Sequence, residues 1–414
     1  MKRRIPKSSK GESTWRDIYD AARKSFLNTG YHKTSVVKIS KAAKVSSATF
    51  YQYFSSKEEV FDIILQSFQT ELQNLFSDSY KREDDMEENL RRMVVGFCNI
   101  TYKFKSEFKA YREAEFTNIV ETAKFHGIFL NFISKTIGKK AKKEDLVHFW
   151  FIIGPLLYLS IFWVLWNDKK VPDSDVEGLI DFYLNGISPE KYEFVFSDLS
   201  LNDNDKSNEI KLDESERTKK KILRAAEILF GKKGYNNTTI HELCSECGCS
   251  VGAFYLYFDS KKEVLESLER ESSHGLRLFL KKYAIKFRDR RDFEIVSYIA
   301  FLKFFSKHKY VYSIIREAEF IDKRIAMEYY DSLQNPYEKG LIEAIKENQI
   351  RKIDVSLLSK ILMGVGHLLG HSLIILGNVS EKEFFDYIKP LSELILNGLK
   401  IKSWEDLKWK KYLL

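Results

Sequence analysis

Proline and cysteine are both scarce in this chain of 414 residues, which has six prolines and four cysteines. Few prolines favour a mostly helical chain, and the modest 19 glycines exclude a collagen-like or low-complexity protein. Cys98 stands alone, whereas Cys244, Cys247 and Cys249 crowd into one stretch, unlike the spaced cysteines of a disulfide scaffold. We therefore expect a protein of the reducing cytoplasm.

Long uncharged segments are also rare. No apolar run follows the basic N-terminus, so we expect no secretory signal peptide. The segment Phe149–Trp166 is uncharged over 18 residues, which is long enough for a membrane span or for a helix buried on all sides of a bundle. We expect the buried helix and no membrane attachment.

The chain repeats itself after 204 residues. At this shift Gly30-Tyr31 falls on Gly234-Tyr235, and the sequence REAEF at 112–116 recurs at 316–320. Near the end the matching shift is 212, so the second copy carries about eight extra residues. A period near 200 is too long for a solenoid repeat. We therefore predict two copies of a whole domain in one chain.

The boundary between the copies is an acidic segment, residues 189–216, with nine acidic residues and three lysines. We interpret it as a solvated linker. The predicted domains are residues 1–65 and 66–188 in copy one, and residues 217–269 and 270–414 in copy two.

Each copy opens with helical patterns typical of a helix-turn-helix. A first helix over about 15–28 ends near Gly30 and is followed by two short helices, the second of which starts after Ser46 or Ser250, both good N-caps. Thr239 and Glu242 predict a capping box that the Ser35–Lys38 pair lacks. We expect further capping boxes at the next helix, from Ser56 with Glu59 and from Ser260 with Glu263. A second short helix with small polar residues outside and aromatic residues behind is suited to reading DNA.

At these residues the chain resembles the TetR family of bacterial repressors. The shared pattern is G-Y…T-[ST]-x-x-x-[IL]…S-x-[AG]-[TA]-F-Y-x-Y-F-x-S-K-x-E, over about 14–65 and 218–269. The resemblance implies an all-α fold: a three-helix DNA-binding domain and a helical bundle in each copy. It also implies double-stranded DNA as partner and a small-molecule effector. The C-terminal regions lack a nucleophile elbow, a P-loop and a Gly-x-Gly-x-x-Gly fingerprint, so we expect no enzyme and no cofactor.

The resemblance assigns DNA contacts residue by residue. Tyr51 and Tyr255 match the tyrosine of the recognition helix, whose hydroxyl usually contacts phosphate. Lys57 and Lys261 match the lysine that opens the fourth helix, where the side chain and the helix N-terminus can meet a phosphate. The other contacts it implies are Thr34, Ser35, Ser46, Ser47, Thr49 and Gln52 in copy one, and Thr238, Thr239, Ser250, Val251 and Ala253 in copy two. Leu256 departs from the family, because leucine offers at most apolar contact. Lys44 stands where the family often has a glycine.

Charge favours the first DNA-binding domain. Residues 1–65 carry a net charge of +7, and residues 215–268 carry +2. Because phosphate contacts dominate affinity, copy one should bind DNA more strongly. Five basic residues of the N-terminus are either a minor-groove arm or a solubilising tail: Lys2, Arg3, Arg4, Lys7 and Lys10.

Two clusters suggest metal binding, and we expect neither to bind a metal. The three neighbouring cysteines align with core positions of copy one and have no fourth ligand nearby in sequence. His367 and His371 lie four residues apart without a carboxylate beside them, so we expect pocket-lining or buried histidines. The repeated REAEF motif is either a surface ion pair or an anchor between the bundle and the DNA-binding domain.

The bundles are rich in aromatic residues, most of which should be core. By resemblance, some of them would also line an effector pocket; the candidates are Phe104, Phe108, Tyr111 and Phe129, with His367 and His371. TetR-like proteins pair their last two helices, and apolar segments suited to pairing are 149–166, 179–187, 357–376 and 391–399.

We therefore predict a cytoplasmic transcriptional regulator, a repressor released by a small apolar ligand. Its two copies would pair within one chain as a pseudo-dimer on an asymmetric operator, with further homodimerisation left open. The alternative is a ligand-binding or interaction protein in which only the first helix-turn-helix binds DNA.

Overall fold

The computed structural model describes residues 8–81, 84–137, 145–196, 213–284, 286–377 and 380–399. All regular elements in these ranges are helices, in agreement with the predicted all-α class. The chain forms two compact units, Met1–Phe149 with Leu159–Val176, and Trp150–Tyr158 with Glu177–Leu414. The second unit therefore contains segments of both sequence copies. Most of the acidic linker lies outside the described residues.

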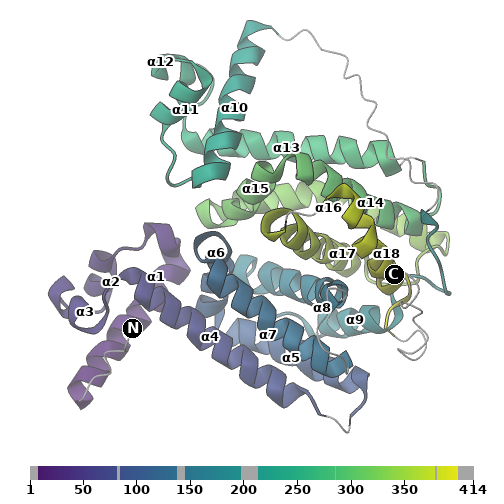
Figure 1. The fold of residues 1–414 in the computed structure, drawn as a ribbon, viewed down its shortest axis with the longest axis horizontal. Helices are drawn as coiled ribbons and strands as arrows, with labels where there is room; N and C mark the ends of the chain where they lie inside the picture. The colour runs from purple at the N-terminus through teal and green to yellow at the C-terminus, as the bar shows by residue number, and fades with distance from the viewer. Residues whose placement is uncertain are drawn as a thin grey trace. The chain divides into compact units, whose positions relative to one another are not determined.

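The first four helices of copy one follow the predicted order, and further helices complete the bundle (Figure 1). They are α1 (Ser9–Lys33), α2 (Val36–Ala42), α3 (Ser47–Tyr53), α4 (Lys57–Ser79), α5 (Met86–Lys103), α6 (Lys105–Thr117), α7 (Ile119–Ile137), α8 (Asp145–Ser160), the π-helical turn η1 (Ile161–Trp166) and α9 (Asp173–Asn185).

Copy two repeats this order. Its helices are α10 (Glu214–Lys233), α11 (Ile240–Cys247), α12 (Val251–Phe254), α13 (Lys261–Ala284), α14 (Arg290–Lys307), α15 (Lys309–Ile321), α16 (Lys323–Lys346), α17 (Val355–Gly370), the π-helical turn η3 (His371–Leu376) and α18 (Glu381–Asn397). Helices α13 to α16 begin 204 residues after α4 to α7, so residues at this shift occupy equivalent positions. The π-helical turn η3 begins 210 residues after η1, so most of the extra residues of copy two lie between the start of α16 and η3.

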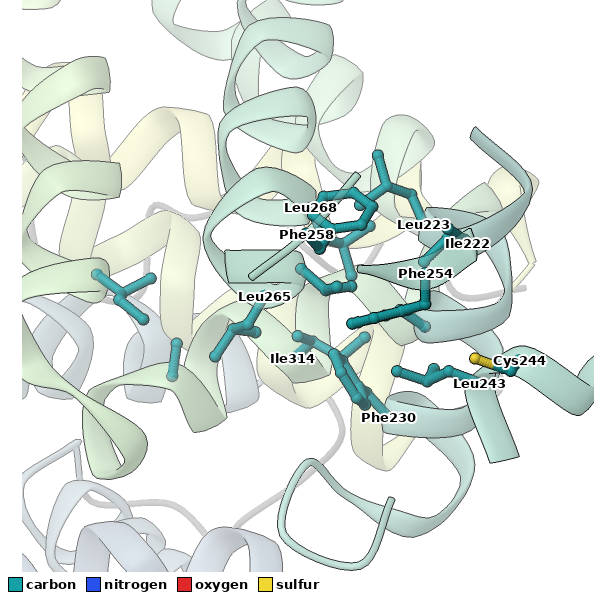
Figure 2. Packing of buried hydrophobic residues seen from close by; sticks show 14 residues of the cluster. Ile222, Leu223, Phe230, Leu243, Cys244, Phe254, Phe258, Leu265, Leu268 and Ile314 are labelled. Carbon is teal, nitrogen blue, oxygen red and sulfur yellow. The ribbon is translucent and has the colours of Figure 1, made fainter. Parts of the chain in front are cut away.

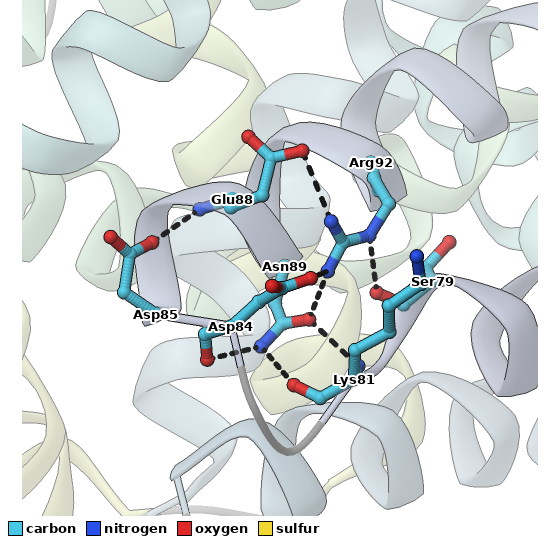
Figure 3. Close-up of polar contacts among 7 residues, drawn as sticks. All are labelled: Ser79, Lys81, Asp84, Asp85, Glu88, Asn89 and Arg92. Atoms are coloured by element: carbon cyan, nitrogen blue, oxygen red, sulfur yellow. Dashed lines mark hydrogen bonds and ion pairs between the residues drawn. The ribbon is translucent and has the colours of Figure 1, made fainter.

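A polar network joins α4 to α5 in copy one (Figure 3). Arg92 donates from Nε to the carbonyl oxygen of Ser79, and Asn89 donates from Nδ2 to that of Lys81. Asp85 caps α5 by accepting from the Glu88 N–H at 2.8 Å. These contacts satisfy backbone groups that helix ends leave without intrahelical partners.

Among the residues that the structure describes, two apolar helical spans are long enough to cross a membrane: Leu146–Trp166 and Val355–Leu376. In an 18-residue apolar stretch of each span, 83% and 72% of the residues, respectively, are buried inside the protein. A core helix of a bundle is apolar nearly all round for the same reason. Burial therefore accounts for the apolar segment 149–166 noted in the sequence.

Within the second unit, α8 crosses α17 closely at two glycines. A Cβ on Gly154 would lie 2.7 Å from the carbonyl oxygen of Gly364, and a Cβ on Gly364 would lie 2.8 Å from that of Gly154. Because glycine has no side chain, the two backbones lie closer together than any other pair of residues would allow.

The ends of α9 and α18 exchange backbone hydrogen bonds in the same unit. The Ile187 N–H donates to the carbonyl oxygen of Ile395 at 2.9 Å, and the Leu399 N–H donates to that of Tyr183 at 2.8 Å. Each bond joins the segment after one helix to the last turn of the other. The contact is therefore reciprocal, with each segment making the same bond to the other.

Candidate nucleic-acid interface

The first helix-turn-helix is built on a small aromatic core. Phe50 and Phe54, on and after α3, are 0% and 1% exposed and pack against each other with ring centroids 5.6 Å apart. Ile39 of α2 and Phe26 of α1 are also buried. This core fixes the angle of α3, as the sequence predicted from the aromatic residues on its inner face.

The first long helix differs from its prediction at both ends. It begins at Ser9, with Ser8 as N-cap, so Lys10 lies in the helix and is not part of an N-terminal arm. The other arm residues, Lys2, Arg3, Arg4 and Lys7, lie outside the described residues. At the other end the helix bends at Gly30, whose φ of +77° is left-handed. Glycine was correctly expected near this position, because other residues pay a steric cost there.

The outer face of α3 carries residues expected to contact DNA bases or phosphates. Gln52 is exposed and Tyr51 is 50% exposed, whereas Ser47 and Thr49 are half-buried. Ser46 caps the helix by accepting from the Thr49 N–H at 2.9 Å, as predicted. Small and polar side chains therefore occupy the N-terminal turn that a recognition helix directs at base edges.

The second helix-turn-helix has the same core and a different surface. Phe254 and Phe258 are buried and pack with Leu243, Leu265 and the other residues of the cluster drawn in Figure 2. On the outside, Val251 is 37% exposed and Leu256 is 81% exposed. Helix α12 has four residues against seven in α3, and Tyr255, 52% exposed, follows its end. Ala253 is half-buried, and its N–H is capped by Ser250 at 3.0 Å.

The turn between the two short helices needs a left-handed residue in each copy. Gly248 supplies it in copy two with φ +71°, and Lys44 supplies it in copy one with φ +56°. A side chain disfavours this conformation, so Lys44 carries strain that Gly248 avoids.

Lys57 and Lys261 brace the turn that precedes the second helix. The Lys57 Nζ donates to the carbonyl oxygens of Tyr31 at 2.9 Å and Thr34 at 3.2 Å, and lies 4.1 Å from the centroid of the Tyr31 ring. Lys261 makes the matching contacts to Tyr235 and Thr238. An ammonium has three N–H donors, so these bonds are compatible with a phosphate contact. The phosphate role stays a prediction.

Two hydroxyl residues precede α2 and α11, Thr34-Ser35 and Thr238-Thr239, and in each pair the first is buried and the second is exposed. Thr34 and Thr238 are 2% and 1% exposed, and each hydroxyl donates to the carbonyl oxygen four residues earlier. Ser35 and Thr239 are exposed N-caps of α2 and α11. The exposed residues are therefore better placed for DNA than the buried ones.

The predicted capping boxes are partly confirmed. Thr239 and Glu242 form the complete box. Ser56 does accept from the Glu59 N–H, but the Glu59 carboxylate returns to the N–H of Ser55, one residue earlier than predicted. In copy two the Glu263 carboxylate likewise accepts from the residue before Ser260. The Glu side chain thus reaches past the cap to a donor that the chain bend brings closer.

A carboxylate from each bundle, buried at Glu113 and half-buried at Glu317, holds the end of the first helix of its own copy. The Glu113 Oε1 accepts from the Tyr31 N–H at 2.7 Å, and the Glu317 Oε2 accepts from the Tyr235 N–H at 3.4 Å. Burial raises the pKa of Glu317. The repeated REAEF motif contains both glutamates, so the anchor interpretation of that motif agrees with these contacts. Arg112 also pairs with Glu115, as its spacing predicted, but this pair is buried and not on the surface.

The cysteines of copy two are thiols at the end of α11. Cys244 is buried and Cys247 is half-buried, with the Cys247 Sγ donating to the Cys249 Sγ at 3.0 Å. Burial raises the pKa of the Cys247 thiol to about 11, which disfavours the thiolate that metals bind. In the described part of the chain no group of three histidine, cysteine or acidic residues could hold a metal ion.

The residues expected to line an effector pocket lie mostly in the cores. Phe108, Tyr111 and Phe129 are at most 1% exposed, and Phe104 is half-buried at the junction of α5 and α6. His371 is buried, and the ring of His367 stacks on Tyr158 with centroids 5.8 Å apart. A cavity of about 640 Å³ lies instead on α4 and α7, lined by polar residues such as Gln69, Asn74 and Asn131.

Comparison with known proteins places both helix-turn-helix domains in one family. Residues 18–64 and 222–268 each match the profile of the bacterial regulatory proteins of the TetR family. The HTH-type transcriptional regulator YerO of Bacillus subtilis is 53% identical over 49 residues, which are 12% of this chain and 17% of YerO.

One longer similarity extends beyond the DNA-binding domains. The HTH-type transcriptional activator FasR of Mycolicibacterium smegmatis is 26% identical over 181 residues, 41% of this chain and 80% of FasR. The crystal structure of the TetR family transcriptional regulator PfmR from Thermus thermophilus is 21% identical, with a TM-score of 0.37 over 43% of this chain and 98% of PfmR. The chain spans only 17% of the length of YerO and of the B. subtilis regulator YuxN.

Proposed function

Because the chain belongs to the TetR family and carries two of its DNA-binding domains in tandem, we propose that it is a sequence-specific transcriptional regulator that binds double-stranded DNA. The observation that carries the proposal is the surface of α3. Its capped N-terminal turn holds small polar side chains, and its outer face exposes Tyr51 and Gln52. Hydrogen-bonding groups in this position suit base edges in a major groove.

We propose that the two copies act as a pseudo-dimer within one chain. The reciprocal contacts of Gly154 with Gly364, and of the ends of α9 and α18, support it. Homodimers bury the same surface patch on both subunits, and these contacts have that form inside a single unit of one chain. Light scattering on the purified protein should give the mass of one chain. A dimer as the smallest stable species would argue for pairing between chains.

The proposed operator is asymmetric. Copy one offers Ser47, Thr49 and Gln52, whereas copy two offers Val251 and Leu256, which can contact only apolar groups such as thymine methyls. Selection of bound sequences from a random DNA library tests this. The half-site under copy two should favour thymine and vary more, and a perfect palindrome as the best binder would contradict the proposal.

A second function is favoured by the exposed Leu256 and by the low charge of copy two. In this alternative only the first helix-turn-helix binds DNA and copy two serves as a ligand-binding or interaction partner. Tyr51→Phe and Tyr255→Phe, measured separately for DNA affinity, distinguish the two. A loss only in Tyr51→Phe would favour the alternative.

The direction of regulation is proposed as repression released by a small, largely apolar effector. A ligand can shift the protein from its DNA-bound state only if it binds the two states differently. A reporter gene behind the selected operator should be silent with the protein and active with the effector. Expression that rises with the protein alone would indicate an activator.

A further inference from the structure

The two bundles differ at one buried place. Helices α4 and α13 begin 204 residues apart, so Leu65 and Phe68 of copy one correspond to Glu269 and Ser272 of copy two. All four side chains are buried, at 0% exposure in copy one and at 4% and 8% in copy two. The same inward face is therefore apolar in one bundle and polar in the other.

In copy one these positions belong to a continuous aromatic core. The Phe68 ring lies 6.1 Å from that of Phe108 and 5.8 Å from that of Phe125, and Phe125 lies 4.1 Å from Tyr111. Ring packing of this kind fills the core of the first bundle around Phe68 with its own side chains.

In copy two the core at this place is smaller and more polar. Ser272 replaces the ring of Phe68, and Tyr329 of α16 replaces Phe125 and adds a hydroxyl. Tyr329 is 2% exposed, and its hydroxyl has no hydrogen-bond partner among the described residues. Glu269 is among the groups that act electrostatically on Tyr329.

Glu269 is buried and its Oε1 likewise lacks a hydrogen-bond partner in the described part of the chain. Burial, with a smaller contribution from the neighbouring Glu328, raises the pKa of its carboxyl to about 9. A buried carboxyl oxygen without a hydrogen-bonded partner is costly and calls for an explanation. A ligand that supplies the missing donor is such an explanation.

The surroundings point to the charge of that ligand. Glu266 and Glu328 act on Glu269 as negative charges, and Arg270 is the opposing positive charge. A run of aromatic rings extends from Tyr329 to Tyr330, with centroids 5.3 Å apart, and from Tyr330 to His367 at 4.9 Å. Ring faces attract cations, and an additional carboxylate would be repelled.

We propose that the second bundle binds a small molecule with an apolar body and a cationic amine, and that Glu269 is the partner of the amine. On binding, the Glu269 carboxyl releases its proton to solvent, and the carboxylate accepts N–H hydrogen bonds from the ammonium group. The first bundle, with Leu65 at this position, offers no such partner. The effector role of this ligand rests on the proposed function, whereas its binding does not.

Three probes that share the same alkyl tail and differ in the charge of the head group test which ligand charge the site prefers. They are decylammonium, decanol and decanoate, each titrated into the full chain by calorimetry. Decylammonium should bind at least about tenfold more tightly than decanol, because a charge-assisted hydrogen bond to the buried acid is added. Decanoate should bind more weakly than either. Repeating the titration in buffers of different ionisation enthalpy should detect the released proton.

Two variants and one control assign the effect to the buried acid. Glu269→Gln should weaken decylammonium binding about tenfold or more, abolish proton release and leave decanol binding unchanged. Tyr329→Phe restores the ring of copy one and should keep the preference for the amine. Glu271→Gln removes a carboxylate from the exposed side of α13 and should change the affinity for neither decylammonium nor decanol.

The proposal is overturned if decanoate binds as tightly as decylammonium, if no probe binds, or if Glu269→Gln leaves amine binding intact. The last two outcomes would indicate that Glu269 meets only a buried water. DNA binding of the ligand-free protein, measured in parallel, separates this proposal from the regulator function. Amine binding without any DNA binding would contradict the regulator and leave the ligand site standing.

Discussion

Gly154 and Gly364 each lie seven residues before the π-helical turn that follows their helix, η1 after α8 and η3 after α17, and each lies against the backbone of the other. A symmetric dimer places equivalent residues of two chains together at its axis. Here the equivalent residues belong to one polypeptide, and the ends of α9 and α18 meet in the same reciprocal way. Neither glycine can gain a side chain without moving the two helices apart.

We expect Gly154→Ala to lower the free energy of unfolding by about 1–3 kcal/mol, as overpacking does. The new Cβ would lie 2.7 Å from the Gly364 carbonyl oxygen, closer than such atoms approach. Gly127→Ala in α7 is the control. A Cβ at Gly127 meets nothing within 4 Å, so this change should stabilise the helix by about 0.5–1 kcal/mol. Urea unfolding measures both, and equal stabilities would show that α8 and α17 do not touch in solution.

Lys44→Gly should stabilise the protein by about 0.5–1 kcal/mol. The change relieves the left-handed conformation that Lys44 adopts at φ +56° and loses part of this gain as chain entropy. Gly248→Ala at the equivalent turn should do the reverse and cost about 1 kcal/mol. Thermal unfolding of both variants checks the pair. If Lys44→Gly lowers the stability of the protein, the Lys44 side chain must make stabilising contacts that outweigh the strain of its backbone.

The short-range features of this fold could be predicted from sequence, and the long-range ones could not. Ser46, Ser250 and the Thr239–Glu242 box act within four residues, so their spacing alone indicated them. The acceptor of the Tyr31 N–H is Glu113, which is 82 residues away. The recurrence of the REAEF motif indicated that Glu113 has a role, but its hydrogen-bond partner could not be predicted, because the partner depends on how α6 packs on α1. Burial of Glu269 was missed for the same reason.

Glu113→Ala should destabilise the first helix-turn-helix by about 1–3 kcal/mol, since the Tyr31 N–H loses its acceptor. Glu113→Gln keeps an acceptor oxygen and should cost less. Glu317→Ala should also cost less than Glu113→Ala, because its bond to Tyr235 is long at 3.4 Å. Unfolding free energy and DNA affinity are measured together. Equal losses in both copies would contradict this ranking.

Glu269 should make the stability of the protein fall as the pH rises. Its folded pKa of about 9 lies above the value near 4.5 in the unfolded chain, so its contribution is present below about pH 4.5 and lost as the pH rises towards 9. Relative to Glu269→Gln, the wild type should lose up to about 1.4 kcal/mol per pH unit over this window. Denaturant unfolding at pH 5, 6, 7 and 8 measures the difference. Glu271→Gln should run parallel to the wild type, and a flat difference for Glu269→Gln would mean that the acid is ionised throughout.

The last prediction exchanges the two residues that follow the tyrosine of each recognition segment. Gln52 can pair with an adenine, whereas Leu256, 81% exposed, can contact only apolar groups. Gln52→Leu should therefore cost about 1–3 kcal/mol of DNA affinity at one base pair of the copy-one half-site and relax the preference there. Leu256→Gln should add an adenine preference in the other half-site and leave the first unchanged. Library selection with each variant measures the preferred sequences. If Leu256→Gln alters no position of the operator while Gln52→Leu does, the second helix-turn-helix does not read DNA, and copy two contributes to the complex only through its bundle.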